Sequence, residues 1–196
     1  MDREKRDLII SWLTVSFAFA WVGPQIFFSS RIFGDFLFNF FVVLIAVGFG
    51  FILHELAHKY VSLHYGVHAE FRAWNFGLIL AVLVAFVTNG RFTFAAPGAV
   101  YILGEVTRKQ NGIISLAGPL TNIVIGLVFS VVGFLFTGSI ISEIAGYISF
   151  INFFLAFFNM IPIYPLDGSK VLAWNGLVWA VFFIPLAFFI FLGRFI

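Results

Sequence analysis

The amino-acid sequence predicts an all-α membrane protein, a polytopic helical bundle of about five or six transmembrane helices with a short membrane-associated β-like or re-entrant segment. Composition is the main support for this fold class. Hydrophobic residues make up 62% of the 196 residues, charged residues make up 10%, and the mean hydropathy is +1.07. Ordinary globular chains carry about 25% charged residues, so this chain has too little polar surface to enclose a soluble core.

The charge and the cysteine count narrow the function classes further. The formal net charge of +2 is too small to indicate nucleic acid as a partner. The absence of cysteine excludes a disulfide framework and a thiolate metal site. Soluble enzymes, secreted modules and DNA-binding proteins are therefore excluded, and the lipid bilayer is the expected environment.

Uncharged runs of roughly the length that spans a bilayer predict the transmembrane helices. The first run is too long for a cleavable signal peptide and lacks a small-residue cleavage pattern. The helical pattern of the second run continues past its charged residues towards Tyr65. The predicted spans are Leu8–Ser30, Phe36–His54, about Ile113–Phe136, Ile144–Leu166 and Val171–Gly193.

The segment between Val67 and Gly104 has a different character. Asn75–Thr88 is apolar but short, and Arg91–Tyr101 has the pattern of an extended segment with a Pro-Gly turn. A complete extra span here would reverse the orientation of every later helix. We therefore expect a re-entrant or half-inserted element, which is tolerated at membrane depth when it packs against protein or a water-filled cavity.

The distribution of basic residues predicts the orientation in the cell membrane, because cytosolic loops carry an excess of lysine and arginine. A cytosolic N-terminus places nine basic residues inside and only Arg31 and Arg194 outside. The predicted cytosolic residues are Arg3, Lys5, Arg6, Lys59, Arg72, Arg91, Arg108, Lys109 and Lys170. The chain is thus expected to be multi-pass, with its C-terminus on the outer side.

The second predicted span contains the motif His54-Glu55-Leu56-Ala57-His58. Residues four apart lie on one face of a helix, so both imidazoles can bind a single metal ion. Glu55 occupies the position of the general base that activates water in HExxH metalloenzymes. The alternative is a group of polar residues buried by accident, but ionisable groups inside a span are costly. The motif predicts a metal site.

A third ligand is needed to hold zinc with one coordination position open. His64 is a poor candidate, because Val61 stands where a glycine would turn the chain back, and six residues past His58 is about 240° round the helix. His64 and His68 are expected to be interfacial polar residues. Asp167 is the better candidate: although Asp-Gly after two prolines is commonly a turn, the topology puts it near the membrane depth of both histidines.

Together these motifs resemble the site-2 protease family of intramembrane zinc metalloproteases. The resemblance covers about residues 36–170 and rests on HELAH, on NMIPIYPLDG at Asn159–Gly168 and on AGPLTN at Ala117–Asn122. It implies one zinc ion per chain bound by His54, His58 and Asp167, with Glu55 as the general base. It also implies that Asn159 binds the substrate backbone or stabilises the oxyanion.

The resemblance extends to a strand-like segment, similar to Ala96–Tyr101 here, whose exposed edge is expected to hold an unwound substrate by strand addition. The sequence departs from the family pattern at the apolar insert Phe76–Asn89. Asn122 belongs to the family-like element AGPLTN, but it can also be interpreted as a small polar contact between helices. We expect residues 1–196 to form a single integral-membrane protease domain.

The implied function is hydrolysis of peptide bonds within or near transmembrane segments of membrane-protein substrates, as in regulated intramembrane proteolysis. One alternative is a non-catalytic zinc-binding membrane protein or transporter, which would keep the metal ligands but would not need Glu55 or Asn159. Another is a membrane metalloprotease with a glutamate as third ligand. Glu143 would have to serve there, but the topology places it at the opposite membrane face from HELAH.

Overall fold

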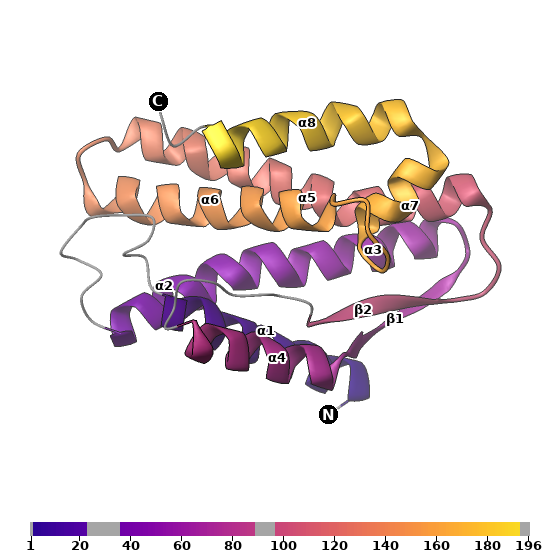
Figure 1. Ribbon diagram of the computed structural model, residues 1–196, viewed down its shortest axis with the longest axis horizontal. Coiled ribbons are helices and arrows are strands. Elements are labelled where there is room, and N and C mark those ends of the chain that lie inside the picture. The colour runs from indigo at the N-terminus through magenta and orange to yellow at the C-terminus, as the bar shows by residue number, and fades with distance from the viewer. Residues whose placement is uncertain (1, 23–35, 89–96, 193–196) are drawn as a thin grey trace.

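The computed structural model describes residues 2–22, 36–88 and 97–192, and most of them are helical (Figure 1). The α-helices are α1 Arg3–Val22, α2 Phe36–Val47, α3 Leu53–His64, α4 Asn75–Val87, α5 Arg108–Leu135, α6 Ile140–Asn159, α7 Asp167–Trp174 and α8 Gly176–Leu192. A π-helical turn, η3 Gly48–Ile52, joins α2 to α3. The strands are β1 His68–Ala73 and β2 Gly98–Leu103.

Among the described residues, three helices are long and apolar enough to cross a membrane. They are Phe40–His64, Arg108–Leu135 and Ile140–Asn159, and α4 and α8 supply shorter apolar helices. A mostly helical membrane protein is therefore confirmed as the fold class. Parts of the first predicted span and of the extended segment at Arg91–Tyr101 lie outside the described residues, as do Arg31, Arg91 and Arg194.

Helix α5 begins earlier than the predicted Ile113 because a capping box starts it. The side chain of Thr107 accepts a hydrogen bond from Gln110 N–H (3.2 Å), and the Gln110 side chain accepts one from Thr107 N–H (2.8 Å). Two of the otherwise unpaired donors of the first turn are satisfied in this way. The helix consequently extends beyond the uncharged run to Arg108.

Helix α6 ends at Asn159, earlier than the predicted Leu166. The next residues form turns up to Leu166, and this stretch contains Pro162 and Pro165. Proline lacks the N–H group that a helix needs, so these two residues prevent continuation of α6. Trp179 Nε1 donates a hydrogen bond to Met160 O (2.9 Å), which attaches the turn to α8.

The last predicted span, Val171–Gly193, is two helices rather than one. Asn175 interrupts the run with an extended backbone (φ −151°). Its Oδ1 accepts hydrogen bonds from the N–H groups of Leu177 (3.0 Å) and Val178 (3.1 Å), which caps the start of α8. A single polar residue in an apolar run is compatible with a continuous span, so hydrophobicity alone did not reveal this break.

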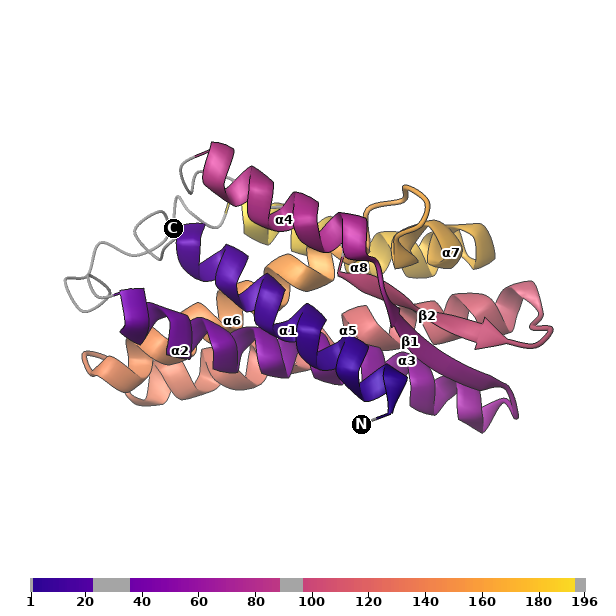
Figure 2. The same cartoon turned by 90° about the horizontal axis from the view of Figure 1, so that it is seen from below.

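The two strands form an antiparallel ribbon whose register runs from His68↔Leu103 to Ala73↔Gly98. Figure 2 shows it at the end of the molecule where α3 ends and α5 begins. Strand β1 was not predicted, although its sequence alternates: Ala69 and Phe71 are buried, whereas His68 is exposed. Phe71 packs edge-on against Phe51 (5.5 Å between ring centroids) and joins the ribbon to the helical core.

The outer edge of β1 is covered by carboxylates from the first turns of α1. Glu4 Oε1 accepts a hydrogen bond from Phe71 N–H (3.2 Å), and Asp7 Oδ2 accepts one from Ala73 N–H (3.4 Å). Glu4 also forms an ion pair with Lys59 Nζ on α3 (2.6 Å). Helix α1 therefore occupies one edge of the ribbon and leaves the opposite edge, on β2, without a neighbouring strand among the described residues.

Replacing Glu4 should destabilise the fold measurably. Glu4→Ala removes the acceptor for the Lys59 ammonium and for Phe71 N–H, both of which are partly buried. We expect the free energy of unfolding to fall by about 1–3 kcal/mol, measured by thermal unfolding in detergent. Glu105→Ala is the matched control, since Glu105 is exposed. Equal thermal stability of the two variants would contradict the proposed edge contact.

Candidate metal centre

Three side chains from two helices bring their ligating atoms together. His54 and His58 lie one helical turn apart on α3, and Asp167 is the first residue of α7. Their ligating atoms all lie within 4.8 Å of one another. Asp167 Oδ2 is 3.3 Å from His54 Nε2 and 3.2 Å from His58 Nε2, and the three side chains are almost completely buried.

This donor set suits zinc. In a tetrahedral site with bonds of about 2.1 Å, neighbouring ligand atoms lie roughly 3.4 Å apart, close to both carboxylate–imidazole separations. Two imidazole nitrogens and one carboxylate oxygen leave the fourth position open, which is the arrangement of catalytic rather than structural zinc. These residues therefore fit a catalytic zinc ion.

Hydrogen bonds on the far side of each imidazole orient the two rings. His58 Nδ1 donates to Ile114 O (2.7 Å), and His54 Nδ1 donates to Asn122 Oδ1 (2.6 Å); both acceptors lie on α5. A proton on Nδ1 leaves Nε2 with a free lone pair. In both histidines that nitrogen faces Asp167, as a metal ligand requires.

Helix α5 also passes directly against the two imidazoles at Gly118. A Cβ atom at this position would lie 2.5 Å from His54 Nε2 and 2.5 Å from His58 Nε2. Any side chain here would displace the two nitrogens that face Asp167. This close approach gives a physical reason for glycine within the sequence AGPLTN.

The two carboxylate oxygens of Asp167 have different neighbours. Oδ2 lies close to Nε2 of both His54 and His58. The second carboxylate oxygen, Oδ1, lies 3.4 Å from Lys170 Nζ. One oxygen of Asp167 thus faces the histidines while the other faces a lysine.

Glu55 and Asn159 reach the same cavity. Glu55 is buried, and its Oε2 has no hydrogen-bond partner among the described residues. Asn159 Nδ2 donates to Leu155 O (3.0 Å), one turn earlier in α6. Both residues line a cavity of about 500 Å³. A buried carboxylate without a partner, next to a metal site, is suited to accept a proton.

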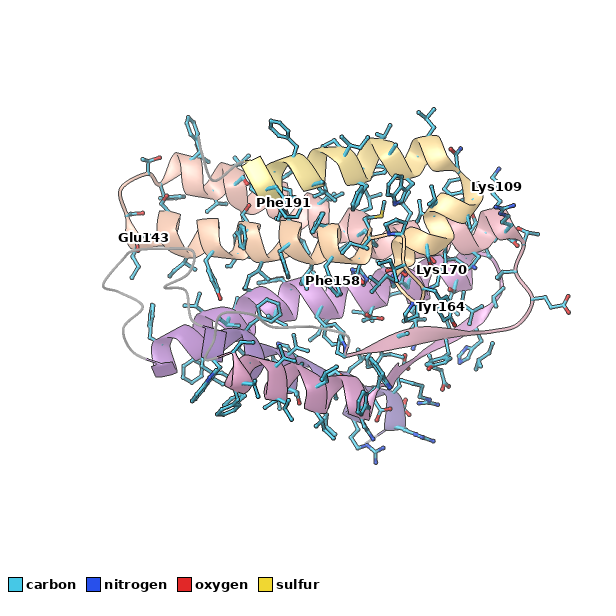
Figure 3. The ribbon with its side chains drawn as sticks, viewed as in Figure 1. Lys109, Glu143, Phe158, Tyr164, Lys170 and Phe191 are labelled. Carbon is cyan, nitrogen blue, oxygen red and sulfur yellow. The ribbon has the colours of Figure 1, made fainter. Side chains whose placement is uncertain are left out.

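The cavity connects the metal centre to β2. Its walls include the candidate metal ligands His54, His58 and Asp167, together with Trp74, Lys170, the turn before α7 and residues 97–102. Figure 3 shows Tyr164 and Lys170 beside this turn, on the side of the molecule that carries the ribbon. An extended chain lying along β2 would therefore have access to the metal centre.

The other residues considered from the sequence lie elsewhere. His64 is exposed at the end of α3, and His68 is exposed on β1, 3.5 Å from Glu70 Oε1; neither belongs to a metal-binding group in the described part of the chain. Glu143 lies at the opposite end of the molecule from Lys170 (Figure 3). Asn122 bonds to His54 and also to Asn152 on α6. Its place in the family-like element AGPLTN is therefore compatible with its interpretation as a small polar contact between helices.

Sequence reasoning did not identify Gly118, the Ile114 carbonyl or Asn152 as parts of the site. A signal was available for Asn152, which is a polar residue in the middle of an apolar run and is completely buried. Buried amides in membrane helices are expected to have hydrogen-bond partners. No local pattern marks the carbonyl of Ile114, because every residue carries one.

Comparison with known proteins agrees with this geometry. The family model of peptidase family M50 matches residues 42–149. "Putative zinc metalloprotease MJ0611" of Methanocaldococcus jannaschii is 45% identical over 187 residues, covering 94% of this chain and 91% of the relative. "Zinc metalloprotease MJ0392" of the same organism is 30% identical over 136 residues, covering 67% of this chain and 33% of the relative. No solved structure matches.

The family match covers more than half of the chain, and the first of these relatives aligns along nearly all of it. The resemblance to site-2 proteases that HELAH, AGPLTN and PLDG predicted is thereby confirmed. The chain belongs to peptidase family M50, the site-2 protease family, and is a zinc metalloprotease.

Proposed function

We propose that this chain hydrolyses peptide bonds within or beside transmembrane segments of membrane-protein substrates, as in regulated intramembrane proteolysis. One observation carries the proposal: the metal-binding group, Glu55 and the exposed edge of β2 share one cavity. The helix that carries both histidines, Phe40–His64, is long and apolar enough to cross a membrane. A substrate in the bilayer would thus meet a hydrolytic site within an apolar bundle.

The proposed ligands are His54, His58 and Asp167, and Glu55 is the proposed general base. When bound, zinc supplies a Lewis acid that polarises the scissile carbonyl and makes water more acidic. Glu55 takes a proton from the attacking water and later delivers it to the leaving amine. Its unpartnered Oε2 supports this role, because no competing hydrogen bond has to be broken first.

Asn159 is proposed to bind the substrate carbonyl. Its amide has two N–H donors, and the structure gives one of them a partner, Leu155 O. The second donor is available to the oxygen on which negative charge develops during attack. A fixed donor at that point stabilises the transition state more than the ground state.

The edge of β2 is proposed to hold the substrate in an extended form. Trp74 N–H donates a hydrogen bond to Pro97 O (2.9 Å), so these two residues, which lie opposite each other just beyond the ends of the strands, form a hydrogen-bonded pair. Bonded and non-bonded pairs alternate, so the N–H and C=O groups of Gly98, Val100 and Ile102 point away from β1. An unwound substrate could pair with these groups as a third strand.

We further propose five membrane spans, with the N-terminus and the active-site opening in the cytosol. The ribbon and the start of α5 lie towards one end of the molecule (Figure 1), and Glu4 in the first turn of α1 bonds to β1. Lys109 lies at that end and Lys170 lies in the same half, whereas Glu143 lies at the opposite end (Figure 3). This distribution agrees with the rule that positive charge favours the cytosolic side.

The ribbon supports a re-entrant path for the insert that contains α4. Ala73 pairs with Gly98, so the chain between them leaves the ribbon and returns to the same place. Such a segment makes no net crossing of the membrane. At about 1.5 Å per residue, the 13 residues of α4 are also too short to span a hydrocarbon core of about 30 Å.

Zinc content tests the ligand assignment. Purified protein should bind about one zinc ion per chain, and His54→Ala, His58→Ala or Asp167→Ala should each lower that content in elemental analysis. His64→Ala is the matched control and should leave the zinc content unchanged, because this histidine is exposed and does not belong to the group. A full zinc content in folded Asp167→Ala would remove Asp167 from the ligand set.

Glu55→Gln should separate metal binding from chemistry. The substitution keeps the shape of the side chain and removes the base, so zinc content and thermal stability should stay normal. Cleavage of a transmembrane peptide should slow by at least about 100-fold. A cleavage rate equal to that of the unaltered protein would rule out Glu55 as the general base.

Gly98 is unsuitable for testing the β2 edge. In the structure a Cβ atom at this position would lie 2.2 Å from Arg72 O and 2.6 Å from Phe71 Cζ. Alanine or proline at Gly98 would therefore disturb the ribbon itself, and a loss of activity would not identify the substrate contact.

Val100→Pro provides the sharper test. Proline removes an N–H that points away from β1, and edge strands tolerate proline there. We expect normal zinc content but at least about tenfold lower kcat/KM on a transmembrane peptide, from the loss of one backbone hydrogen bond and the rigid ring. Val100→Ala trims the side chain but keeps the N–H and serves as the control. Equal kcat/KM for both variants would place substrate docking elsewhere.

A further inference from the structure

Behind the metal centre, two buried side-chain amides form a chain of hydrogen bonds across three helices. Asn122 on α5 and Asn152 on α6 are both completely buried. Asn122 Nδ2 donates to Asn152 Oδ1 (3.0 Å) and to Gly50 O (2.9 Å), and Asn152 Nδ2 donates to Ile148 O (2.9 Å). The remaining polar atom, Asn122 Oδ1, faces His54 Nδ1 at 2.6 Å.

The direction of this chain is determined by its two carbonyl ends. Ile148 O can only accept, so Asn152 must turn its NH₂ group towards it and present Oδ1 to Asn122. Gly50 O can also only accept, so Asn122 must turn its NH₂ group towards η3. Asn122 then offers His54 an acceptor, and the ring proton of His54 must reside on Nδ1. Nε2 is left free to bind metal.

The π-helical turn places Gly50 where the two amides can reach it. Gly50 O accepts hydrogen bonds from Leu53 N–H and from Asn122 Nδ2. A Cβ atom on Gly50 would lie 2.7 Å from Leu155 Cδ1 and 3.1 Å from Asn152 Oδ1. Irregular π-helical turns are frequent next to functional sites, and this one lets α5 and α6 approach the helix just before HELAH.

We propose that Asn152 is a positioning residue that selects the metal-binding tautomer of His54 through Asn122. Without Asn152, the NH₂ group of Asn122 keeps only its hydrogen bond to Gly50 O, and this single bond has to fix the orientation of the amide. Rotation of that amide would present NH₂ to Nδ1 and move the ring proton to Nε2, the atom that faces Asp167. Asn152 is absent from the cavity wall, so it acts on the metal centre through Asn122 and makes no contact with substrate.

Zinc affinity, measured by competition with a chelating indicator on purified protein in detergent, tests this inference. Asn152→Leu keeps the approximate volume but removes both hydrogen bonds, and it should weaken zinc binding by about 10–100-fold. Asn152→Asp should stay close to the unaltered protein, because a buried, protonated carboxyl can still donate to Ile148 O and accept from Asn122.

Ser149→Ala is the matched control. Ser149 is also buried on α6 and bonds to Gly126 O (2.8 Å), but it is not connected to His54, so zinc affinity should not change. In zinc-free protein, ¹⁵N NMR of the histidine rings should show the His54 proton on Nδ1 before the Asn152→Leu change and on Nε2 after it. A residue that merely stabilised the fold would not move this signal.

If Asn152→Leu does not fold, Asn152→Thr takes its place. Threonine is polar and can donate a hydrogen bond to Ile148 O, but its side chain is too short to reach Asn122. Zinc affinity equal to that of the unaltered protein in whichever variant folds would overturn the inference. The inference rests on the proposed ligand role of His54. Loss of zinc in His54→Ala with normal zinc affinity in Asn152→Leu would reject the positioning role alone.

Discussion

The close approach of α5 to the two histidines of α3 is the contact on which the rest of the site depends. At Gly118 the two helices leave no space for a side chain, and the imidazoles lie directly against the α5 backbone. This proximity lets Ile114 O and Asn122 bond to the outer ring nitrogens. Both metal-facing nitrogens are thereby oriented before any ion binds, which reduces the reorganisation that metal binding requires.

An apolar bundle makes every polar atom near the metal costly unless it has a partner. The amides of Asn122 and Asn152 each find carbonyl or amide partners, and the second oxygen of Asp167 lies near Lys170. Glu55 Oε2 is the exception at the metal centre, since it is buried without a partner among the described residues. The polar atom left unpaired therefore belongs to the residue proposed to move protons.

The ribbon presents two edges in different environments. Glu4 and Asp7 accept hydrogen bonds from the outward-pointing N–H groups of β1, so these N–H groups are not available to pair with an added strand. The edge of β2 lines the cavity instead. Unpaired strand edges generally invite pairing with another chain, and in this protein the available edge is the one beside the metal centre.

Composition and local periodicity were sufficient to determine a helical membrane protein and to put His54 and His58 on one helical face, because four-residue spacing is a property of the helix itself. The tertiary structure decided which distant groups complete the site. Asp167 is 113 residues from His54, and Asn152 reaches that histidine only through Asn122. It also decided the pairing of β1 and the break at Asn175. These features depend on how separate elements pack, which the hydrophobic pattern of any one segment does not specify.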